Sequence, residues 1–157
     1  MSKRKVCVVT GSRAEYGLLR NLMSLLRDDD RAELSVLVTG MHLVPEMGMT
    51  VDEIVADGFP VSERVESQLA SDSSAGMAKS LGLGVIGCTN GLTRLAPDVV
   101  VLLGDRYEIF AVAIVASIIG IPVAHISGGE VTAGAVDDWI RHAITKASWW
   151  HFVAAEP

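Results

Sequence analysis

The chain lacks the features that mark secreted, membrane-spanning or disulfide-stabilised proteins. It has only two cysteines, Cys7 and Cys88, which form neither a C-x-x-C pair nor a dense disulfide pattern. The longest apolar run, residues 109–121, has 13 residues, whereas a helix that spans a bilayer needs about 20. The basic residues 3–5 precede an apolar run too short for a secretory signal. These absences predict a reduced, cytoplasmic protein with no membrane association.

Positive charge is also scarce. Lysine and arginine together number 13 against 19 acidic residues, which gives a formal net charge of -6, and the acids are spread along the chain. Long-range attraction to nucleic acid or to anionic membranes is therefore disfavoured, and any bound anion must be held by local groups. Half of the residues are apolar, which suffices for one substantial core. We expect a single domain over residues 1–157.

Short apolar strands alternate with helices along the chain. Strands are expected at residues 6–9, 34–38, 61–65, 99–103, 123–126 and 151–153, and helices at 16–27, 51–56, 76–95, 109–121 and 137–147. Continuous apolar strands that alternate with helices indicate an α/β fold, in which helices cover both faces of an open parallel sheet. The glycines of the 76–95 helix suggest close packing. No repeat, low-complexity tract or linker interrupts the pattern.

Polar loops follow four of these strands, at residues 11–15, 39–42, 104–108 and 127–130. Ligands of open α/β sheets bind beyond the carboxyl ends of the strands, so these loops are the candidate site. Gly11-Ser12-Arg13 opens a helix, where free backbone N–H groups and the Arg13 guanidinium are suited to phosphate. An ordinary strand-to-helix turn with Arg13 on the surface is equally compatible, because the segment is neither G-x-G-x-x-G nor a P-loop.

The charged segment Gly104-Asp105-Arg106-Tyr107-Glu108 directly follows the most hydrophobic strand. Charges there would be costly to bury unless they reach a solvent-filled cleft, which favours a functional role for Asp105 and Arg106. In the alternative, Asp105 caps the following helix while Arg106 and Glu108 are solvated.

Further carboxylates come from Glu130, Asp137 and Asp138. Carboxylates crowded in a cleft can take separate acid and base roles, because their surroundings shift their proton affinities apart. Alternatively, Asp137 or Asp138 caps the last helix, and the other serves chemistry or pairs with Arg141.

The four histidines lack the spacing of a zinc site, so no metal is expected, and no nicotinamide or other cofactor signature is present. His125, within an apolar strand, is expected to be a hydrogen-bonded core residue, and His42, at a strand end, is a candidate for substrate contact. The adjacent Trp149 and Trp150 cannot both easily bury in one domain. Together with the apolar 109–121 helix, they predict a homo-oligomer.

Four segments resemble the hydrolysing UDP-N-acetylglucosamine 2-epimerases. They are VTGSRAEYGLL near residue 10, TGMHL near residue 40, GDRYE at 104–108 and HISGGEVTAGAVDDWIRHAITK at 125–146. The resemblance spans nearly the whole chain. It implies the first of two Rossmann-like domains in the glycosyltransferase-B arrangement, with a nucleotide sugar bound between them and the C-terminal nucleotide-binding domain absent from this chain. Such enzymes supply N-acetylmannosamine-type sugars for sialic and legionaminic-type acids.

The resemblance also implies roles for individual residues. Arg13 lies near the diphosphate and His42 near the substrate, while Asp105, Asp137, Asp138 and Arg141 lie in or beside the catalytic pocket; Arg106 and Ser127 complete the candidates for substrate binding. Many relatives have a catalytic glutamate at the position of Ser127, as H-I-E-G-G-E. Glu130 or a neighbouring aspartate therefore takes over that duty, or the subgroup works differently.

The implied reaction eliminates the nucleoside diphosphate across C1 and C2 and adds water with inversion at C2. UDP-N-acetylglucosamine is the expected substrate, with a guanosine nucleotide left open. Two alternatives stay open: a glycosyltransferase of glycosyltransferase-B fold, and a non-catalytic nucleotide-sugar-binding or oligomerisation domain. The isolated chain is expected to be inactive or nearly so, because half of the cleft is absent.

Overall fold

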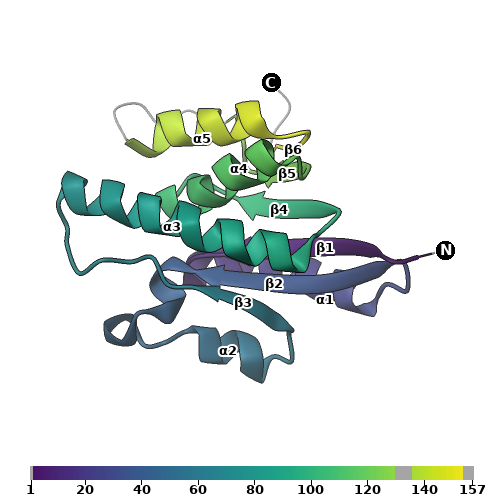
Figure 1. Cartoon of the computed structure of the whole chain (residues 1–157). Coiled ribbons are helices and arrows are strands. Elements are labelled where there is room, and N and C mark those ends of the chain that lie inside the picture. The colour runs from purple at the N-terminus through teal and green to yellow at the C-terminus, as the bar shows by residue number, and fades with distance from the viewer. Residues whose placement is uncertain (1, 130–135, 154–157) are drawn as a thin grey trace.

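Six strands form one open sheet in the computed structural model, which describes residues 2–129 and 136–153 (Figure 1). The strands are β1 (Arg4–Thr10), β2 (Ala32–Thr39), β3 (Val61–Val65), β4 (Val99–Leu103), β5 (Val123–Ile126) and β6 (Trp150–Phe152). Their spatial order is β3-β2-β1-β4-β5-β6, and all neighbours run parallel. The predicted Rossmann-like sheet is confirmed. Chain order reverses between β1 and β4, and ligands of such sheets bind beyond the carboxyl ends of the strands at this switch point.

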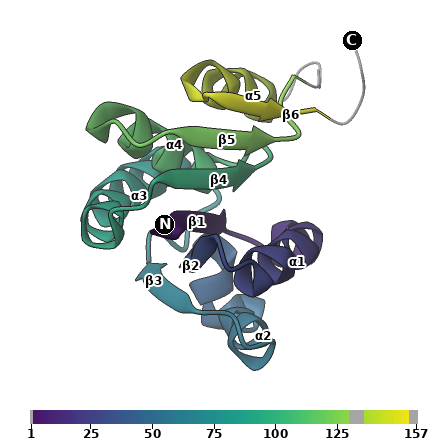
Figure 2. The same cartoon turned by 90° about the vertical axis from the view of Figure 1, so that its right-hand side faces the viewer.

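Helices cover both faces of the sheet (Figure 2). They are α1 (Arg13–Asp28), α2 (Val51–Ala56), α3 (Ser74–Leu95), α4 (Tyr107–Ile119) and α5 (Val136–Ala147), with the 3-10 helices η1 (Gly40–Leu43) and η2 (Pro45–Met47) after β2. One buried cluster joins the sheet to α1 and α2, and a second joins it to α3, α4 and α5. Right-handed crossovers produce this division, because strands are added in opposite directions on the two sides of β1. None of the helices in the described part of the chain is long and apolar enough to cross a membrane.

Strand β1 shows why the strands read as continuous apolar runs. Val6 and Val8 face the cluster with α1 and α2, whereas Cys7 and Val9 face the cluster with α3 and α4. Both faces are buried, so no polar alternation is possible. Cys7 and Cys88 are free thiols in the same core, and burial raises the pKa of each to about 12. Both thiols therefore stay protonated at neutral pH.

The longest apolar run forms α4, which confirms the predicted buried helix. It begins at Tyr107 rather than Ile109, and Gly120, with φ +79°, ends it in the left-handed conformation that favours glycine. α4 packs between α3 and α5, so most of its apolar surface is covered within the domain. Its exposed residues are confined to 117–119. This helix therefore offers less free surface for self-association than its sequence suggests.

Trp149 and Trp150 lie at the last strand of the sheet. They are 70% and 49% exposed, and their ring centroids are 6.4 Å apart. Neither ring is buried in this domain, which agrees with the expectation that the two cannot bury together. Formation of a homo-oligomer stays a prediction.

Glycines in α3 allow this helix to approach its neighbours closely, as the sequence suggested. A Cβ atom on Gly87 would lie 2.5 Å from Cγ1 of Val65 in β3, and one on Gly84 would lie 3.1 Å from Cβ of Ala111 in α4. By contrast, a Cβ atom on the exposed Gly82 would meet nothing within 4 Å. The three positions share a helical backbone and differ in what lies beside them.

This difference predicts opposite effects of two alanine substitutions in one helix. Gly82→Ala should raise the free energy of unfolding by about 0.5–1 kcal/mol, because alanine has the higher helix propensity. Gly87→Ala should lower it by about 1–3 kcal/mol, because the new methyl group overlaps Val65. Urea denaturation of the two variants would measure both changes, and equal effects would contradict the packing of α3 on β3.

Candidate functional site

The loops after β1, β2 and β4 meet at the switch point, around the side chain of Glu108. A Cβ atom on Gly11 would lie 3.6 Å from Cβ of Glu108. One on Gly40 would lie 3.1 Å from Oε1 of Glu108 and 2.9 Å from the Gly11 carbonyl oxygen. The Met41 backbone N–H donates to that same carbonyl at 2.8 Å. Glycines at positions 11 and 40 therefore let three strand ends close around one carboxylate.

Glu108 and Glu15 hold Arg106 between them, and we call these three residues the Glu15–Arg106–Glu108 cluster. Nη2 of Arg106 donates to Oε1 of Glu108 at 2.9 Å, and its Nε lies 4.0 Å from Oε1 of Glu15. Oε2 of Glu15 accepts from the Gly11 backbone N–H at 2.7 Å. The side chain of Glu108 has 0% exposure and that of Arg106 has 38%. The alternative in which Glu108 is solvated is therefore wrong, because the Gly11 and Gly40 loops cover it.

Burial changes the proton affinity of Glu15. Loss of hydration raises the pKa of Glu15 from its ordinary value of 4.5 to about 7, and the nearby Glu108 carboxylate acts in the same direction. The Gly11 N–H group and the Arg106 guanidinium oppose this rise. Glu15 therefore titrates near neutral pH, next to a cation that faces solvent.

Asp105 stands on the turn between β4 and α4, and its carboxylate accepts a hydrogen bond from Nη2 of Arg141 in α5. The Arg141 side chain is 8% exposed and that of Asp105 is 23% exposed. The capping alternative for Asp105 is wrong, because the N-cap of α4 is Arg106, which makes no side-chain cap. The structure thus joins two of the predicted site residues that are 36 positions apart in the chain.

His125 forms a hydrogen bond with the turn that carries Asp105. Its Nε2 donates to the Gly104 carbonyl oxygen at 2.7 Å, which leaves Nδ1 to accept from the Thr145 hydroxyl at 3.2 Å. Burial lowers the pKa of His125, so the ring is neutral at pH 7. The predicted role as a hydrogen-bonded core residue is confirmed.

The loop after β5 is pressed against this histidine. A Cβ atom on Gly128 would lie 2.8 Å from both Nδ1 of His125 and Oγ1 of Thr145. Ser127 has φ +61°, a left-handed conformation that non-glycine residues rarely adopt, and its backbone N–H donates to the Phe152 carbonyl at 2.9 Å. Substrate binding by Ser127 stays a prediction, and Glu130 lies outside the described residues.

The acids predicted on the last helix occupy the first turn of α5. Asp138 lies 3.8 Å from Nε2 of His142, and Asp137 is exposed. Arg141 follows Asp138 by three positions, which places both on one side of the helix. α5 thus brings its two acids to the same end of the sheet as Asp105.

Two predicted substrate contacts, Arg13 and His42, are paired with other side chains of the domain. Arg13 is on the surface, with 74% of its side chain exposed, and pairs with Glu53 of α2 at 3.2 Å. His42 has no exposed surface; its Nε2 and Nδ1 lie 2.9 and 2.7 Å from the hydroxyls of Thr10 and Thr50. Burial lowers the pKa of His42 to about 4. The ring thus anchors the loop after β2, and contact between His42 and substrate stays a prediction.

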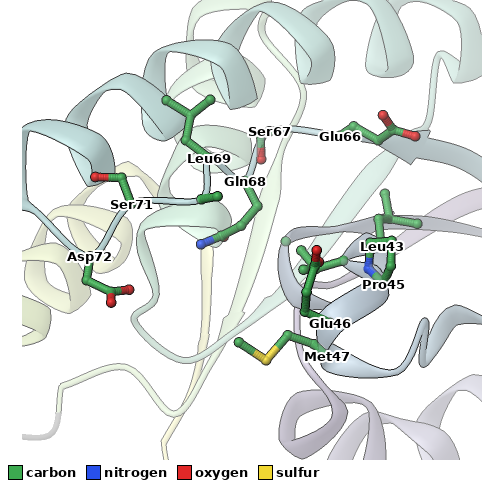
Figure 3. A pocket seen from close by; sticks show the side chains of 13 residues that line it. Leu43, Pro45, Glu46, Met47, Glu66, Ser67, Gln68, Leu69, Ser71 and Asp72 are labelled. Atoms are coloured by element: carbon green, nitrogen blue, oxygen red, sulfur yellow. The ribbon is translucent and has the colours of Figure 1, made fainter.

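A pocket of about 520 Å³ opens beside Gly40, between η1–η2 and the segment after β3 (Figure 3). Glu46 and Met47 line one side, and Gln68, Ser71 and Asp72 line the other. The Tyr107 hydroxyl, from the same charged segment as Asp105, donates to Oε1 of Gln68 at 2.6 Å. This contact ties the pocket to the start of α4. Within residues 2–129 and 136–153, no three His, Cys, Asp or Glu side chains are grouped to hold a metal ion.

Sequence reasoning placed Glu15 and Glu108 in the candidate loops without singling them out as site residues, and it missed the 66–72 segment. Ser12 and Glu15 have the spacing of a capping box, and the Glu15 backbone N–H does donate to Oγ of Ser12 at 3.4 Å. That spacing was the available signal for an inward-facing Glu15. For the 66–72 segment the sequence contained no comparable signal, because its residues line a pocket only once β3 is placed beside β2.

Comparisons with known proteins point to one family. The model of the family described as UDP-N-acetylglucosamine 2-epimerase matches residues 24–157. The chain is 44% identical over 156 residues to GDP/UDP-N,N'-diacetylbacillosamine 2-epimerase (hydrolyzing) of Campylobacter jejuni, covering 99% of this chain and 40% of that protein. It is 46% identical over 153 residues to UDP-N,N'-diacetylbacillosamine 2-epimerase (hydrolyzing) of Legionella pneumophila, covering 98% of this chain and 40% of that protein.

A solved structure shows the same fold. The crystal structure of UDP-GlcNAc 2-epimerase from Neisseria meningitidis bound to UDP-GlcNAc superposes with a TM-score of 0.81 at 22% identity, over 95% of this chain and 39% of that one. The chain thus spans about 40% of the length of the proteins it matches. With the family model covering most of its residues, the chain belongs to the UDP-N-acetylglucosamine 2-epimerase family.

Proposed function

We propose that the full-length protein containing this chain is a hydrolysing 2-epimerase of a nucleotide-linked 2-acetamido sugar. The observation that carries the proposal is the pairing of Asp105 with Arg141 beside the half-exposed Arg106, at the switch point of the sheet. A carboxylate suited to proton transfer and a cation suited to a diphosphate thus stand on one turn. The two relatives whose names include "hydrolyzing" support the reaction class.

The substrate is a UDP-linked sugar with an acetamido group at C2. UDP-N-acetylglucosamine is the expectation from the sequence, but the relatives at 44% and 46% identity are named for UDP-N,N'-diacetylbacillosamine. These identities favour the diacetylated sugar over its simpler counterpart. One of the two names also includes GDP, so a guanosine nucleotide belongs in the assay.

In the proposed reaction a carboxylate removes the C2 proton, and the C1–O bond breaks as the nucleoside diphosphate departs with the electron pair. Water then adds at C1, and a proton returns to C2 on the opposite face. Asp105 is our choice for one of these proton transfers, with Asp137 or Asp138 of α5 for the other. Arg106 and Arg13 would stabilise the departing diphosphate. A second, nucleotide-binding domain and a cytoplasmic location complete this proposal.

The test is an assay of the full-length protein in deuterium oxide. The substrates are UDP-N-acetylglucosamine and the UDP- and GDP-linked forms of N,N'-diacetylbacillosamine. The expected products are free nucleoside diphosphate and a free 2-epimerised sugar with deuterium at C2. Transfer of the sugar to an acceptor would favour the glycosyltransferase alternative. Binding of nucleotide sugar without any turnover would favour the non-catalytic alternative.

The turnover rate of the 157-residue chain by itself should be less than about 1% of the rate of the full-length protein, because a one-sided cleft cannot exclude water from the reacting sugar. Product release measured at equal molar concentrations of the two proteins would check this. Turnover by the short chain within about tenfold of the full-length rate would contradict a site built between two domains.

A further inference from the structure

The Glu15–Arg106–Glu108 cluster places two carboxylates against a single guanidinium. With both acids ionised its net charge is −1, and with one proton bound its net charge is zero. Three of its polar atoms, Oε1 of Glu15, Nε of Arg106 and Oε2 of Glu108, are buried and have no hydrogen-bond partner among the described residues. Such atoms are costly to bury, and a bound proton reduces that cost by removing one of the charges.

Glu15 is the member of the cluster that can accept this proton. Its Oε2 is fixed by the Gly11 N–H, while Oε1 points toward Arg106 at 4.0 Å without a hydrogen bond. Glu108 is tied directly to Arg106 by the hydrogen bond at 2.9 Å. Arg106 meanwhile keeps 38% of its side chain exposed, and it follows β4 at the switch point of the sheet.

We propose that Glu15 is a positioning residue that takes up a proton when the diphosphate of the nucleotide sugar docks on Arg106, so that the cluster binds the anion in its neutral rather than its negative form. This inference rests on the proposed function. It assigns a role to Glu15, which lies 4.0 Å from Arg106 and acts on the substrate through it. It also makes substrate affinity depend on pH.

The direction of the coupling follows from charge. An anion beside the cluster stabilises the protonated form of Glu15, so by linkage protonation of Glu15 strengthens anion binding. Affinity should therefore be highest below about pH 7, and it should weaken as pH rises through the pKa of Glu15, which is about 7. The diphosphate of a nucleotide sugar is a diester and has no proton to lose in this range.

The groups packed around Glu15 come from α4 and from the loop after β1. Glu108 and Arg106 are the charged groups that face it from the α4 side, and Gly11 and Ser12 contribute backbone N–H and hydroxyl groups from the β1 loop. His42, beneath that loop, has a pKa of about 4 and stays neutral. Arg13 is turned to Glu53.

The experiment measures KM and kcat of the full-length protein from about pH 6 to about pH 8 for wild type and Glu15→Gln. Glutamine keeps an oxygen for the Gly11 N–H and cannot ionise, so it imitates protonated Glu15. We expect the wild-type KM to rise about fivefold from pH 6 to pH 8. The KM of Glu15→Gln should stay near the value that wild type has at pH 6, and kcat should not carry the pH effect. Glu33→Gln, at an exposed position of β2, is the matched control and should keep the wild-type profile.

An infrared titration gives a readout that does not depend on turnover. A protonated-carboxyl band near pH 6 that is absent from Glu15→Gln supports the proposal, and its absence from wild type overturns it. If wild type and Glu15→Gln both turn over substrate and their KM values depend on pH in the same way, this inference is overturned while the proposed function stands. Failure to turn over any nucleotide sugar overturns both.

Discussion

Replacing Asp105 with asparagine is expected to lower kcat of the full-length protein by about 10³-fold, since a positioned acid or base contributes about 10²–10⁴ to the rate. Asparagine keeps the size of the side chain and an oxygen that can accept from Arg141, so the turn between β4 and α4 should persist. It cannot exchange a proton with C2 of the sugar. Product release under saturating substrate measures the effect.

The control for this variant is Asp30→Asn, at an exposed turn before β2 and far from the strand ends that carry the site. It should leave kcat within about twofold of wild type, as surface substitutions usually do. Asp105→Asn will also lose part of the attraction to a guanidinium that is only 8% exposed, so its melting temperature should fall by a few degrees. A folded Asp105→Asn variant with near-wild-type kcat would remove Asp105 from the chemistry.

Replacing Gly40 with alanine is expected to lower the free energy of unfolding by about 2–4 kcal/mol and to raise KM. Gly40 has φ +58°, which costs an alanine about 1 kcal/mol. Its new methyl group would also lie 2.9 Å from the Gly11 carbonyl oxygen and 3.1 Å from Oε1 of Glu108, which adds about 1–3 kcal/mol of overpacking. Relief of this overlap would move Glu108, which accepts the hydrogen bond from Arg106.

Gly48→Ala separates these two causes. Gly48 also has a positive φ, +87°, but a Cβ atom there would meet nothing within 4 Å. In Gly48→Ala the free energy of unfolding should fall only by the cost of the positive φ, about 1–2 kcal/mol, and KM should not change. Urea denaturation and KM measured on both variants provide the comparison. If the two variants lose the same free energy of unfolding and have the same KM, the loops after β1, β2 and β4 are not packed around Glu108.

Much of the fold could be predicted because its signals are local. The bounds of the strands at 61–65, 99–103 and 123–126 agree with the structure, since each strand follows a proline by one or two positions and is itself followed by glycine or a polar residue. Helix starts were less accurate: α1 begins at Arg13 rather than Tyr16, because the Ser12 side chain caps it by accepting from the Glu15 N–H. α4 likewise begins earlier than its apolar run, at Tyr107.

The sequence by itself determined the parallel α/β architecture and the end of the sheet where polar loops gather, because hydrophobic period and strand ends are properties of neighbouring residues. Only the tertiary structure decided which charges meet. The pairing of Asp105 with Arg141 depends on α5 packing beside the β4 turn, and the burial of Glu108 depends on Gly11 and Gly40 closing over it. Electrostatic environment is a sum over groups that come close in space, so it arises only when distant loops are brought together.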